Sequence, residues 1–98
     1  MKILITTRAR QDLREIGDFI AADNPLRARS FILELRDACM ALAEQPLRFP
    51  QLEGFADGNY RRRVYGNYLI IYRAEESLVR VIRVVSASVN LTNTGLGV

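Results

Sequence analysis

The sequence contains no histidine, a single cysteine and a single lysine. Because Cys39 has no second cysteine to pair with, no intrachain disulfide can form, and a reducing compartment is the simple inference. The absence of histidine removes the side chain that most often carries protons near neutral pH. No stretch approaches the ~20 apolar residues of a membrane span, and the apolar residues after Met1 run out too early for a signal peptide. We therefore expect a soluble protein of the cytoplasm.

The 98 residues leave room for one hydrophobic core and not for two. A domain of this size buries roughly 60–70% of its unfolded surface, which is enough to fold without cross-links. Hydrophobic residues make up 49% of the chain and charged residues 26%, as in an ordinary globular protein. We predict one domain over residues 1–98, in which residues 87–98 form a mobile tail because they show no periodicity of either kind.

Positive charge is concentrated in the second half of the chain. Residues 1–59 carry eight basic and nine acidic side chains, whereas residues 60–98 carry six basic and two acidic ones. All six basic residues of the second half are arginines, which suit planar, bidentate recognition of carboxylates or phosphates. This half is therefore expected to meet an acidic partner, either nucleic acid or an acidic protein.

Apolar residues at helical spacing predict two helices in the first half. A short strand is expected over residues 2–5, after which Thr6 can cap the first helix. The first pattern ends near residues 22–23, and Asn24-Pro25 is a start signal for the second helix. Gln45-Pro46 stops the second helix, whose expected core stripe is Ala28, Phe31, Leu35, Ala38 and Leu42. Two helices joined by so few residues must lie roughly antiparallel.

From residue 60 onward the pattern becomes that of β-strands. β-branched and aromatic residues flank a tight Gly66-Asn67 turn, which predicts a β-hairpin. A turn at residues 75–77 leads to a third strand over residues 78–85, whose β-branched residues favour a central position. With residues 46–58 as a loop, the order is β-α-α-β-β-β. This order predicts an α+β fold, in which an antiparallel helical hairpin packs on one face of a small, mainly antiparallel sheet.

A two-residue turn would pair Tyr65 with Tyr68 and so divide the hairpin into two faces. One face is basic and aromatic: Arg61, Arg63, Tyr65, Tyr68, Ile70 and Tyr72. The other face carries Tyr60, Arg62, Val64, Leu69, Ile71 and Arg73. We predict that the second set faces the core and that the first set is an exposed functional surface. A one-residue slip in the pairing would exchange the two faces.

The arginines also have a purely structural interpretation. Three consecutive arginines on an edge strand can serve only to block edge-to-edge aggregation. Arg73 and Arg83 lie beside or within apolar strand sequence. They must therefore reach solvent, pair with a carboxylate such as Asp12 or Asp18, or meet a partner. Cys39 is expected to pack as a small apolar residue of the second helix.

Several short motifs follow one another along residues 3 to about 90. They are Thr6-x-x-Ala9-x-x-Asp12-Leu13-x-x-Ile16-x-x-Phe19-Ile20, Asp23-Asn24-Pro25, Leu42-Ala43-Glu44-Gln45-Pro46, Tyr60-Arg61-Arg62, Gly66-Asn67-Tyr68-x-Ile70-x-Tyr72-Arg73 and Ile82-Arg83-Val84-Val85. Their order and spacing resemble those of the RelE/ParE toxins of bacterial toxin–antitoxin modules. The Asp-Asn-Pro junction and the short final strand are most similar to the ParE branch.

The resemblance implies a toxin that poisons DNA gyrase and is held inactive by a ParD-like antitoxin with an acidic, amphipathic C-terminal helix. This antitoxin would wrap the helical hairpin and the sheet, filling the groove between the two helices and contacting the face with Arg61, Arg63, Tyr68 and Tyr72. No catalytic residue, metal or cofactor is expected, nor direct DNA binding outside the antitoxin complex. The residues expected to bind antitoxin or target are Arg61, Arg62, Arg63, Tyr65, Tyr68, Tyr72, Arg73 and Arg83.

Two alternatives remain open at this stage. RelE-like relatives cleave messenger RNA in the ribosome, and such cleavage needs proton carriers as well as cations for the phosphate. Here the segment after Val85 has no Lys, Arg, Tyr or His, which disfavours a nuclease. The other alternative is an attenuated toxin that retains only antitoxin binding. ParE-like chains often carry a His after the last strand and an Asp or Asn four residues on, and the matching positions here are Ser86 and Asn90.

Overall fold

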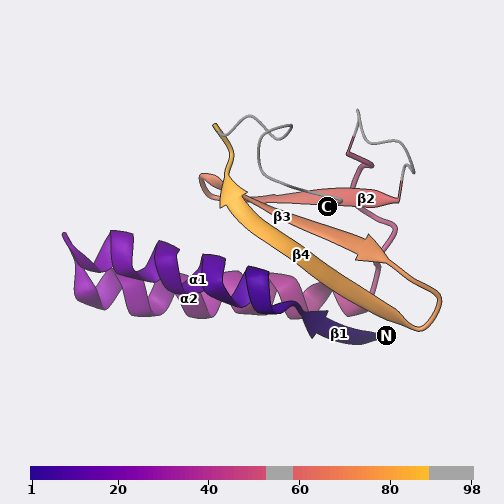
Figure 1. Ribbon diagram of the computed structural model, residues 1–98, viewed down its shortest axis with the longest axis horizontal. Coiled ribbons are helices and arrows are strands. Elements are labelled where there is room, and N and C mark those ends of the chain that lie inside the picture. The colour runs from indigo at the N-terminus through magenta and orange to yellow at the C-terminus, as the bar shows by residue number, and fades with distance from the viewer. Residues whose placement is uncertain (53–58, 89–98) are drawn as a thin grey trace.

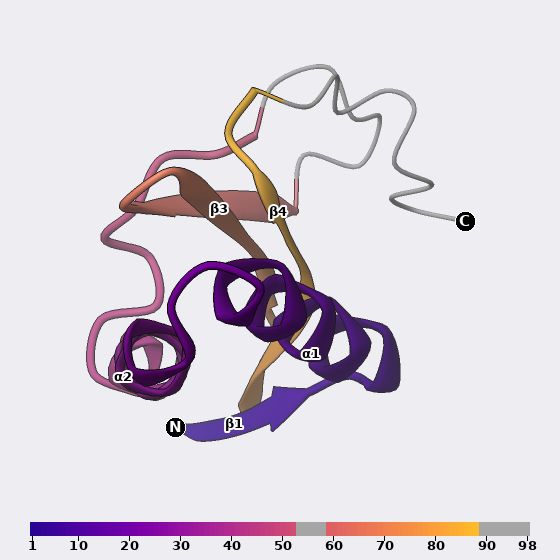
Figure 2. The ribbon, with the colours of Figure 1, turned by 90° about the vertical axis from the view of Figure 1, so that its left-hand side faces the viewer.

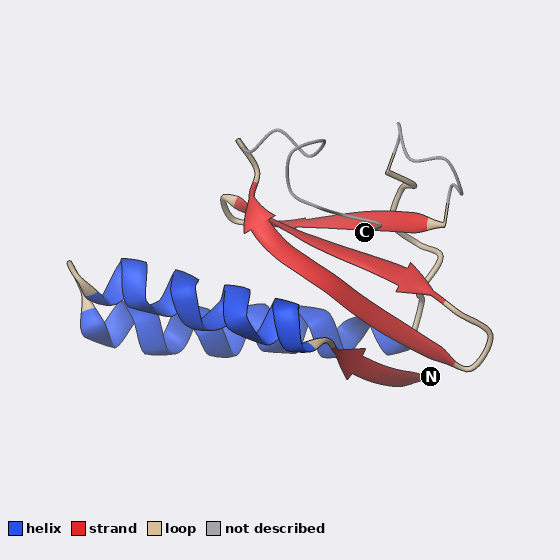
Figure 3. Ribbon diagram, viewed as in Figure 1, coloured by secondary structure: helices blue, strands red, loops and turns tan. Residues whose placement is uncertain are grey.

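The computed structural model describes residues 1–52 and 59–88, and it has the predicted α+β architecture (Figure 1). Its elements are β1 (Lys2–Ile5), α1 (Thr7–Ala21), α2 (Pro25–Met40), the 3-10 helix η1 (Ala41–Ala43), β2 (Tyr60–Tyr65), β3 (Tyr68–Ala74) and β4 (Leu78–Ser86). The two helices form one layer and the sheet forms the other (Figure 3). The order β-α-α-β-β-β is confirmed.

Side-chain caps fix the start of each helix, as the sequence predicts. The Thr6 hydroxyl accepts a hydrogen bond from the backbone N–H of Ala9 at 3.2 Å. The Asn24 side chain accepts one from the N–H of Arg27 at 3.0 Å, and Pro25 occupies the first turn of α2. These caps satisfy N–H groups that have no partner within the helix, and each is worth about 1 kcal/mol.

The sheet has four strands in the order β1-β4-β3-β2. Strand β1 runs parallel to β4, and the other neighbouring pairs are antiparallel. Strand β4 is therefore central, as predicted, and β2 is an edge strand. Part of the β2 edge is covered, because the Leu52 N–H donates to the Tyr60 carbonyl and the Arg62 N–H donates to the Pro50 carbonyl.

The predicted register of the β2–β3 hairpin is confirmed. Tyr65 pairs with Tyr68, Arg63 with Ile70, and Arg61 with Tyr72. Gly66 has a φ of 57° and Asn67 does not have a positive φ, which is the pattern of a type II′ turn. An L side chain at Gly66 would be strained, so glycine at this position sets the turn and with it the register.

The main core lies between the helices and the inner face of the sheet (Figure 2). It contains the predicted α2 stripe and the inward residues of the sheet: Ala9, Leu13, Ile16, Phe31, Leu35, Ala38, Cys39, Leu42, Ile70, Tyr72, Val79, Val81 and Val84. A smaller cluster covers the outer face of the sheet and comprises Leu52, Tyr60, Leu69, Ile71 and Val85. The three-stranded part of the sheet is thus apolar on both faces.

The prediction of which hairpin face is exposed was wrong. Ile70 and Tyr72 of the supposed surface have no exposed area and belong to the main core, with Tyr65 and Tyr68 packed against it. The helices pack against the large aromatic side chains of this face, whereas Val64 on the opposite face is 60% exposed. The pairing did not slip; only the assignment of the inward face was reversed.

Candidate partner-binding surfaces

Two of the three consecutive arginines are bound to backbone carbonyls inside the fold. Arg63 donates to the Ala38 carbonyl at 2.8 Å, and Arg61 donates to the Phe49 carbonyl at 2.7 Å. Ala38 lies in the last turn of α2, where carbonyls lack helical partners and a cation is favourable. The Arg63 guanidinium also lies 5.0 Å from the centre of the Phe49 ring. These two arginines hold the hairpin to α2 and to the segment that follows it.

The tyrosines of the same face are also engaged within the molecule. The Tyr72 hydroxyl donates to the Pro46 carbonyl at 2.6 Å, and burial raises the pKa of this phenol. The Tyr65 hydroxyl donates to Glu34 at 2.8 Å, and this hydrogen bond raises the pKa of Tyr65. The Tyr68 ring packs on Phe31 with centroids 5.7 Å apart. Since both phenols have raised pKa values, neither suits the role of a proton-accepting base near neutral pH.

Glu34 joins the hairpin to the first turn of α2. Arg27 donates to both of its carboxylate oxygens, at 2.7 and 3.4 Å. The hydrogen bond from Arg27, and then that from Tyr65, lower the pKa of Glu34. The same contacts raise the pKa of Arg27, chiefly through the hydrogen bond. Because these groups are largely exposed, the network positions the hairpin more than it stabilises the fold.

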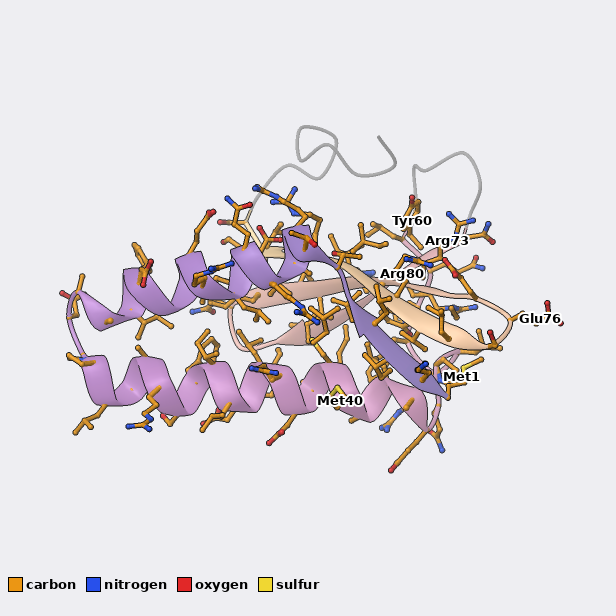
Figure 4. The ribbon with its side chains drawn as sticks, turned by 60° about the horizontal axis from the view of Figure 1, so that its bottom comes forward. Met1, Met40, Tyr60, Arg73, Glu76 and Arg80 are labelled. Carbon is orange, nitrogen blue, oxygen red and sulfur yellow. The ribbon has the colours of Figure 1, made fainter. Side chains whose placement is uncertain are left out.

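Alternation along β2 and β3 places Arg62 and Arg73 on the outer face of the sheet, where Arg80 of β4 joins them. Arg73 is paired with Arg80 across the strands and lies 5.8 Å from the centre of the Tyr60 ring. Figure 4 shows Tyr60, Arg73 and Arg80 close together on this part of the sheet. The side chain of Arg62 makes no hydrogen bond or ion pair with the residues that the structure describes.

Glu75 neutralises part of this outer basic surface. Arg80 donates to both of its carboxylate oxygens, at 3.0 and 3.3 Å, and Arg73 lies 3.9 Å from one of them. The hydrogen bond from Arg80 lowers the pKa of Glu75. Neither Arg80 nor Glu75 was among the partner-binding residues expected from the sequence. The position of Glu75 in the 75–77 turn, five residues before Arg80, could have indicated the pair.

Arg83 takes one of the three positions foreseen for it, a pair with Asp12. Its guanidinium donates to the two oxygens of the carboxylate at 2.7 and 3.1 Å. Asp12 is only 4% exposed and also accepts the backbone N–H of Val84 at 2.9 Å. Strand β1 pairs with β4 only as far as Val81. Further along β4, the Asp12 carboxylate accepts the backbone N–H of Val84 in place of a neighbouring strand. Arg83 therefore has a structural partner within the fold, which does not by itself exclude a further contact.

Of Ser86 and Asn90, the two positions that the family resemblance connects with toxicity, only Ser86 lies within the described residues. Ser86 is the last residue of β4, and its hydroxyl lies 3.0 Å from that of Ser88. The Ser88 backbone N–H is 3.4 Å from the Ser86 hydroxyl, a weak contact. Asn90 and most of the expected tail lie outside the described residues, and only residues 87–88 of that segment are described, as a turn.

A groove of about 730 Å³ runs between the two helices, beginning beside Ile5 of β1. We call it the interhelical groove. Its floor is apolar and its rims are basic, with the lining Ile5, Arg10, Leu13, Arg14, Gly17, Asp18, Ala28, Arg29, Ile32, Leu33 and Arg36. Four arginines and one aspartate give this lining a net charge of +3. Within residues 1–52 and 59–88, the guanidinium groups of Arg14, Arg29 and Arg36 have no hydrogen bond or ion pair.

Among the described residues there is no group of three acidic, cysteine or histidine side chains that could hold a metal ion. Cys39 is fully buried, and desolvation raises its pKa from 9.0 to about 11, so the thiol is a poor nucleophile at neutral pH. Within the described ranges, no helix is both long and apolar enough to cross a bilayer.

Solved structures of other proteins share this fold. One neighbour is the chromosomal ParDE toxin–antitoxin system from P. aeruginosa, with a TM-score of 0.75 and 15% identity over 88% of this chain and 95% of that one. Another is the toxin–antitoxin complex RelBE2 from Mycobacterium tuberculosis, with a TM-score of 0.65 and 22% identity over 87% of this chain and 95% of that one. At these identities the likeness shows the fold alone.

The family itself is shown by sequence. Residues 3–91 match the family model for the ParE toxin of the type II toxin–antitoxin system, parDE, so the chain belongs to the ParE toxin family. No curated protein matches the sequence. The resemblance described from the motifs is thereby confirmed, including its assignment to the ParE branch.

Proposed function

We propose that this chain is a cytoplasmic toxin that inhibits DNA gyrase by binding and is neutralised by a ParD-like antitoxin. The observation that carries the proposal is the ParE family match over residues 3–91. The internal contacts of the polar side chains support a non-enzymatic mode of action. Arg83, the best candidate for holding a phosphate, is bound to Asp12, and Tyr65 and Tyr72 donate their hydroxyl hydrogens to Glu34 and to the Pro46 carbonyl.

The outer face of the sheet is the surface that we propose for the target. Arg62 and Arg73, both expected from the sequence to meet a partner, lie there with Arg80. Arg61, Arg63, Tyr65 and Tyr68 are half-buried and Tyr72 is buried, so any contact that they make with a partner is confined to their exposed edges. Charge reversal at Arg61 and Arg63 would therefore also break contacts within the fold.

A RelE-like, ribosome-dependent ribonuclease is the second candidate. It is favoured by the arginines on the outer face of the sheet and by the structural likeness to the RelBE2 complex. Arg62→Ala tests the outer face under either candidate function, because this side chain has no hydrogen bond or ion pair within the described residues and its loss leaves the fold intact. Arg83→Ala is unsuitable, since it would leave the buried Asp12 carboxylate without its main partner.

The test is pulse labelling of DNA and protein synthesis after induced expression without an antitoxin. Early loss of DNA synthesis, together with inhibition of supercoiling by purified gyrase, is the expected result. Early loss of translation with unaffected supercoiling would overturn the proposal in favour of mRNA cleavage. If neither synthesis changes, the chain is an attenuated toxin, and Ser86→His is the first variant to examine for a gain of toxicity.

A further inference from the structure

Helix α2 is apolar on two opposite sides. Its inward side supplies Phe31 and Leu35 to the core, whereas Leu26, Leu33 and Met40 on the other side are 82%, 58% and 53% exposed. We call these three residues the exposed apolar row of α2. They are spaced seven residues apart, so the row follows the helix for about 21 Å on the side that faces away from the core. An exposed row with this spacing is typical of the seam along which a second helix packs.

The two flanks of the row carry opposite charges. On a helix, residues three positions after a row residue lie on one flank, and residues four positions after it lie on the other. The first flank holds Arg29 and Arg36, which also line the interhelical groove. The second flank holds Ser30 and Asp37, both exposed. The side chains of Arg29, Arg36 and Asp37 make no hydrogen bond or ion pair with the described residues, so all three charges are available to a partner.

We propose that the exposed apolar row is the seam of a homodimer, in which the α2 helices of two copies pack in parallel about a twofold axis along the seam. Each row residue then packs on the same residue of the second copy. The twofold rotation places the basic flank of each copy against the acidic flank of the other. Arg36 and Asp37 of the second copy differ in height by roughly one residue's rise of 1.5 Å, so they can form an ion pair on each side of the seam.

The charges determine both the occupant and its direction. An antiparallel second copy would bring the flank with Arg29 and Arg36 against the same basic flank, and Asp37 against Asp37, which is repulsive on both sides. Nucleic acid would suit the two arginines, but it has no apolar side chains to cover the row. A parallel second copy supplies the apolar row and the complementary flanks at the same time.

The seam leaves the proposed target surface accessible. The row faces away from the core, and the sheet lies on the opposite side of the helical layer (Figure 2). The outer face with Arg62 and Arg73 is therefore available once in each copy. The inference goes beyond the proposed function and does not depend on it. Because one helix per copy forms the seam, the interface falls below ~1,200 Å² in total, and association is expected to be weak.

The first test is sedimentation equilibrium of the full chain between about 10 µM and about 1 mM. A monomer–dimer equilibrium is expected, with a dissociation constant on the order of 100 µM. Leu33→Ser removes the centre of the row and should weaken association at least about ten-fold. Val64→Ser, at an exposed apolar position of the sheet, is the matched control and should associate like wild type. Both positions are exposed, and circular dichroism checks that both variants fold. A monomer at about 1 mM would overturn the inference and leave the row to a partner of another kind.

Charge swaps test the ion pair across the seam. Arg36→Glu and Asp37→Arg each place two like charges together on both sides of the axis, so each should weaken association about ten-fold. The double variant exchanges the charges of the two flanks and should recover the wild-type dissociation constant to within about three-fold. A purely local effect on α2 would not be rescued in this way. A double variant that associates as weakly as the single variants would overturn the proposed arrangement.

A disulfide test determines the direction of the helices. In a parallel dimer the two copies of residue 26 meet, so Leu26→Cys should form a covalent dimer when oxidised glutathione is added. Wild type is the control and should not cross-link, because Cys39 is fully buried. In an antiparallel dimer residue 26 would lie opposite Met40. Cross-linking only in a mixture of Leu26→Cys and Met40→Cys would therefore overturn the parallel arrangement.

The dimer and the proposed function fail independently. If gyrase is inhibited by a chain that remains monomeric at about 1 mM, the inference is wrong and the proposed function stands. If the dimer forms through the row and supercoiling is unaffected, the inference stands and the gyrase target is wrong.

Discussion

Two groups of arginines in this molecule have opposite surroundings. Arg61 and Arg63 are near neighbours in sequence, and both guanidinium groups donate to backbone carbonyls within the fold. Arg63 donates to Ala38 in the last turn of α2, and Arg61 donates to Phe49 in the segment after α2. Arg29 and Arg36 are two helical turns apart on the same side of α2. Both line the interhelical groove, as does Arg14 of α1. Two of the three arginines in the run that stands out in the sequence are thus structural, whereas arginines scattered along the helices form an accessible basic surface.

The difference follows from strand and helix geometry. Alternate residues of a strand point to opposite faces, so a run of three arginines on β2 cannot form one patch. Residues three, four or seven apart on a helix share a face, so arginines at such spacings gather on one side. Clustering in sequence therefore indicates a basic surface in a helix better than in a strand.

Arg83 is the most fully engaged arginine of the second half, and removing its partner should have the largest effect. Asp12→Ala is expected to lower the free energy of unfolding by about 3–5 kcal/mol, because it removes the buried carboxylate that pairs with Arg83 and leaves the buried Val84 N–H without its acceptor. Urea unfolding followed by circular dichroism measures the loss. Asp18→Ala, at an exposed position of the same helix, is the control and should change stability by less than about 0.5 kcal/mol. A loss below about 1 kcal/mol for Asp12→Ala would show that the pair contributes little.

Much of the fold could be predicted from the sequence because it depends on local signals. The Thr6 and Asn24 caps, the helical periodicity and the Gly66 turn each act within a few residues, and all were correct. The inward face of the hairpin could not be predicted in this way. It depends on which face the helices cover, and both faces carry apolar side chains, so composition could not distinguish them.

The candidate surfaces were less predictable than the fold. The Asp12–Arg83 pair was among the stated options, but choosing it required the distance between α1 and β4. The exposed apolar row of α2, which comprises Leu26, Leu33 and Met40, was not predicted from the sequence. These residues are recognisable as an exposed row only once the opposite side of the helix is known to be buried. Once Ala28, Phe31 and Leu35 were assigned to the core, a second row of apolar residues could have been sought on the far side of the same helix.

Cys39 is buried close enough to both groups of arginines for the charges of Arg63 and Arg36 to affect the pKa of its thiol. Desolvation raises its pKa from 9.0 to about 11, while the charges of Arg63 and then Arg36 oppose the rise. Because the pKa is higher in the folded state than in the unfolded chain, the protonated thiol contributes to the free energy of unfolding. This contribution is fully present below pH 9 and is lost as the pH rises toward 11. A shift of this size corresponds to about 3 kcal/mol. Urea unfolding between pH 8 and pH 11 measures it.

Cys39→Ala is the control for this titration. It costs stability at every pH through the lost thiol contacts, but it lacks the ionising group, so its stability should fall less steeply between pH 9 and pH 11. Other titrating groups contribute equally to both proteins and cancel in the difference. Parallel curves over this range would mean that the thiol ionises as readily in the folded protein as in the unfolded chain.

Arg63 and Arg62 allow a direct comparison of neighbouring arginines. Arg63→Ala is expected to cost about 2 kcal/mol, since it removes a charge-assisted hydrogen bond to the Ala38 carbonyl and a contact with the Phe49 ring. Arg62→Ala should change stability by less than about 0.5 kcal/mol. Thermal and urea unfolding of both variants measure the difference. Equal losses would mean that the structural role of Arg63 is overstated.

The smallest expected effect concerns Arg27 and Arg29, which lie two residues apart on α2. Arg27 is bound to Glu34, whereas Arg29 lines the interhelical groove without a hydrogen bond or ion pair among the described residues. The Arg27 contact lowers the pKa of Glu34 from its ordinary value of 4.5. A lowered pKa in the folded state gives stability that is present above pH 4.5 and is lost as the pH falls through the folded value.

Glu34→Gln should therefore make stability less sensitive to pH below 4.5, measured by urea unfolding between pH 3 and pH 6. Glu44→Gln is the control, because the Glu44 carboxylate makes no hydrogen bond or ion pair with described residues and its loss should leave this slope unchanged. Added salt should shrink the difference between the two variants, since the Arg27–Glu34 pair is exposed. If the free energy of unfolding falls equally steeply with decreasing pH in wild type and in Glu34→Gln, the Arg27–Glu34 pair does not contribute to stability, as is true of many exposed ion pairs. Arg27 would then be as available to an acidic partner as Arg29, and the basic surface of α2 would extend beyond the interhelical groove.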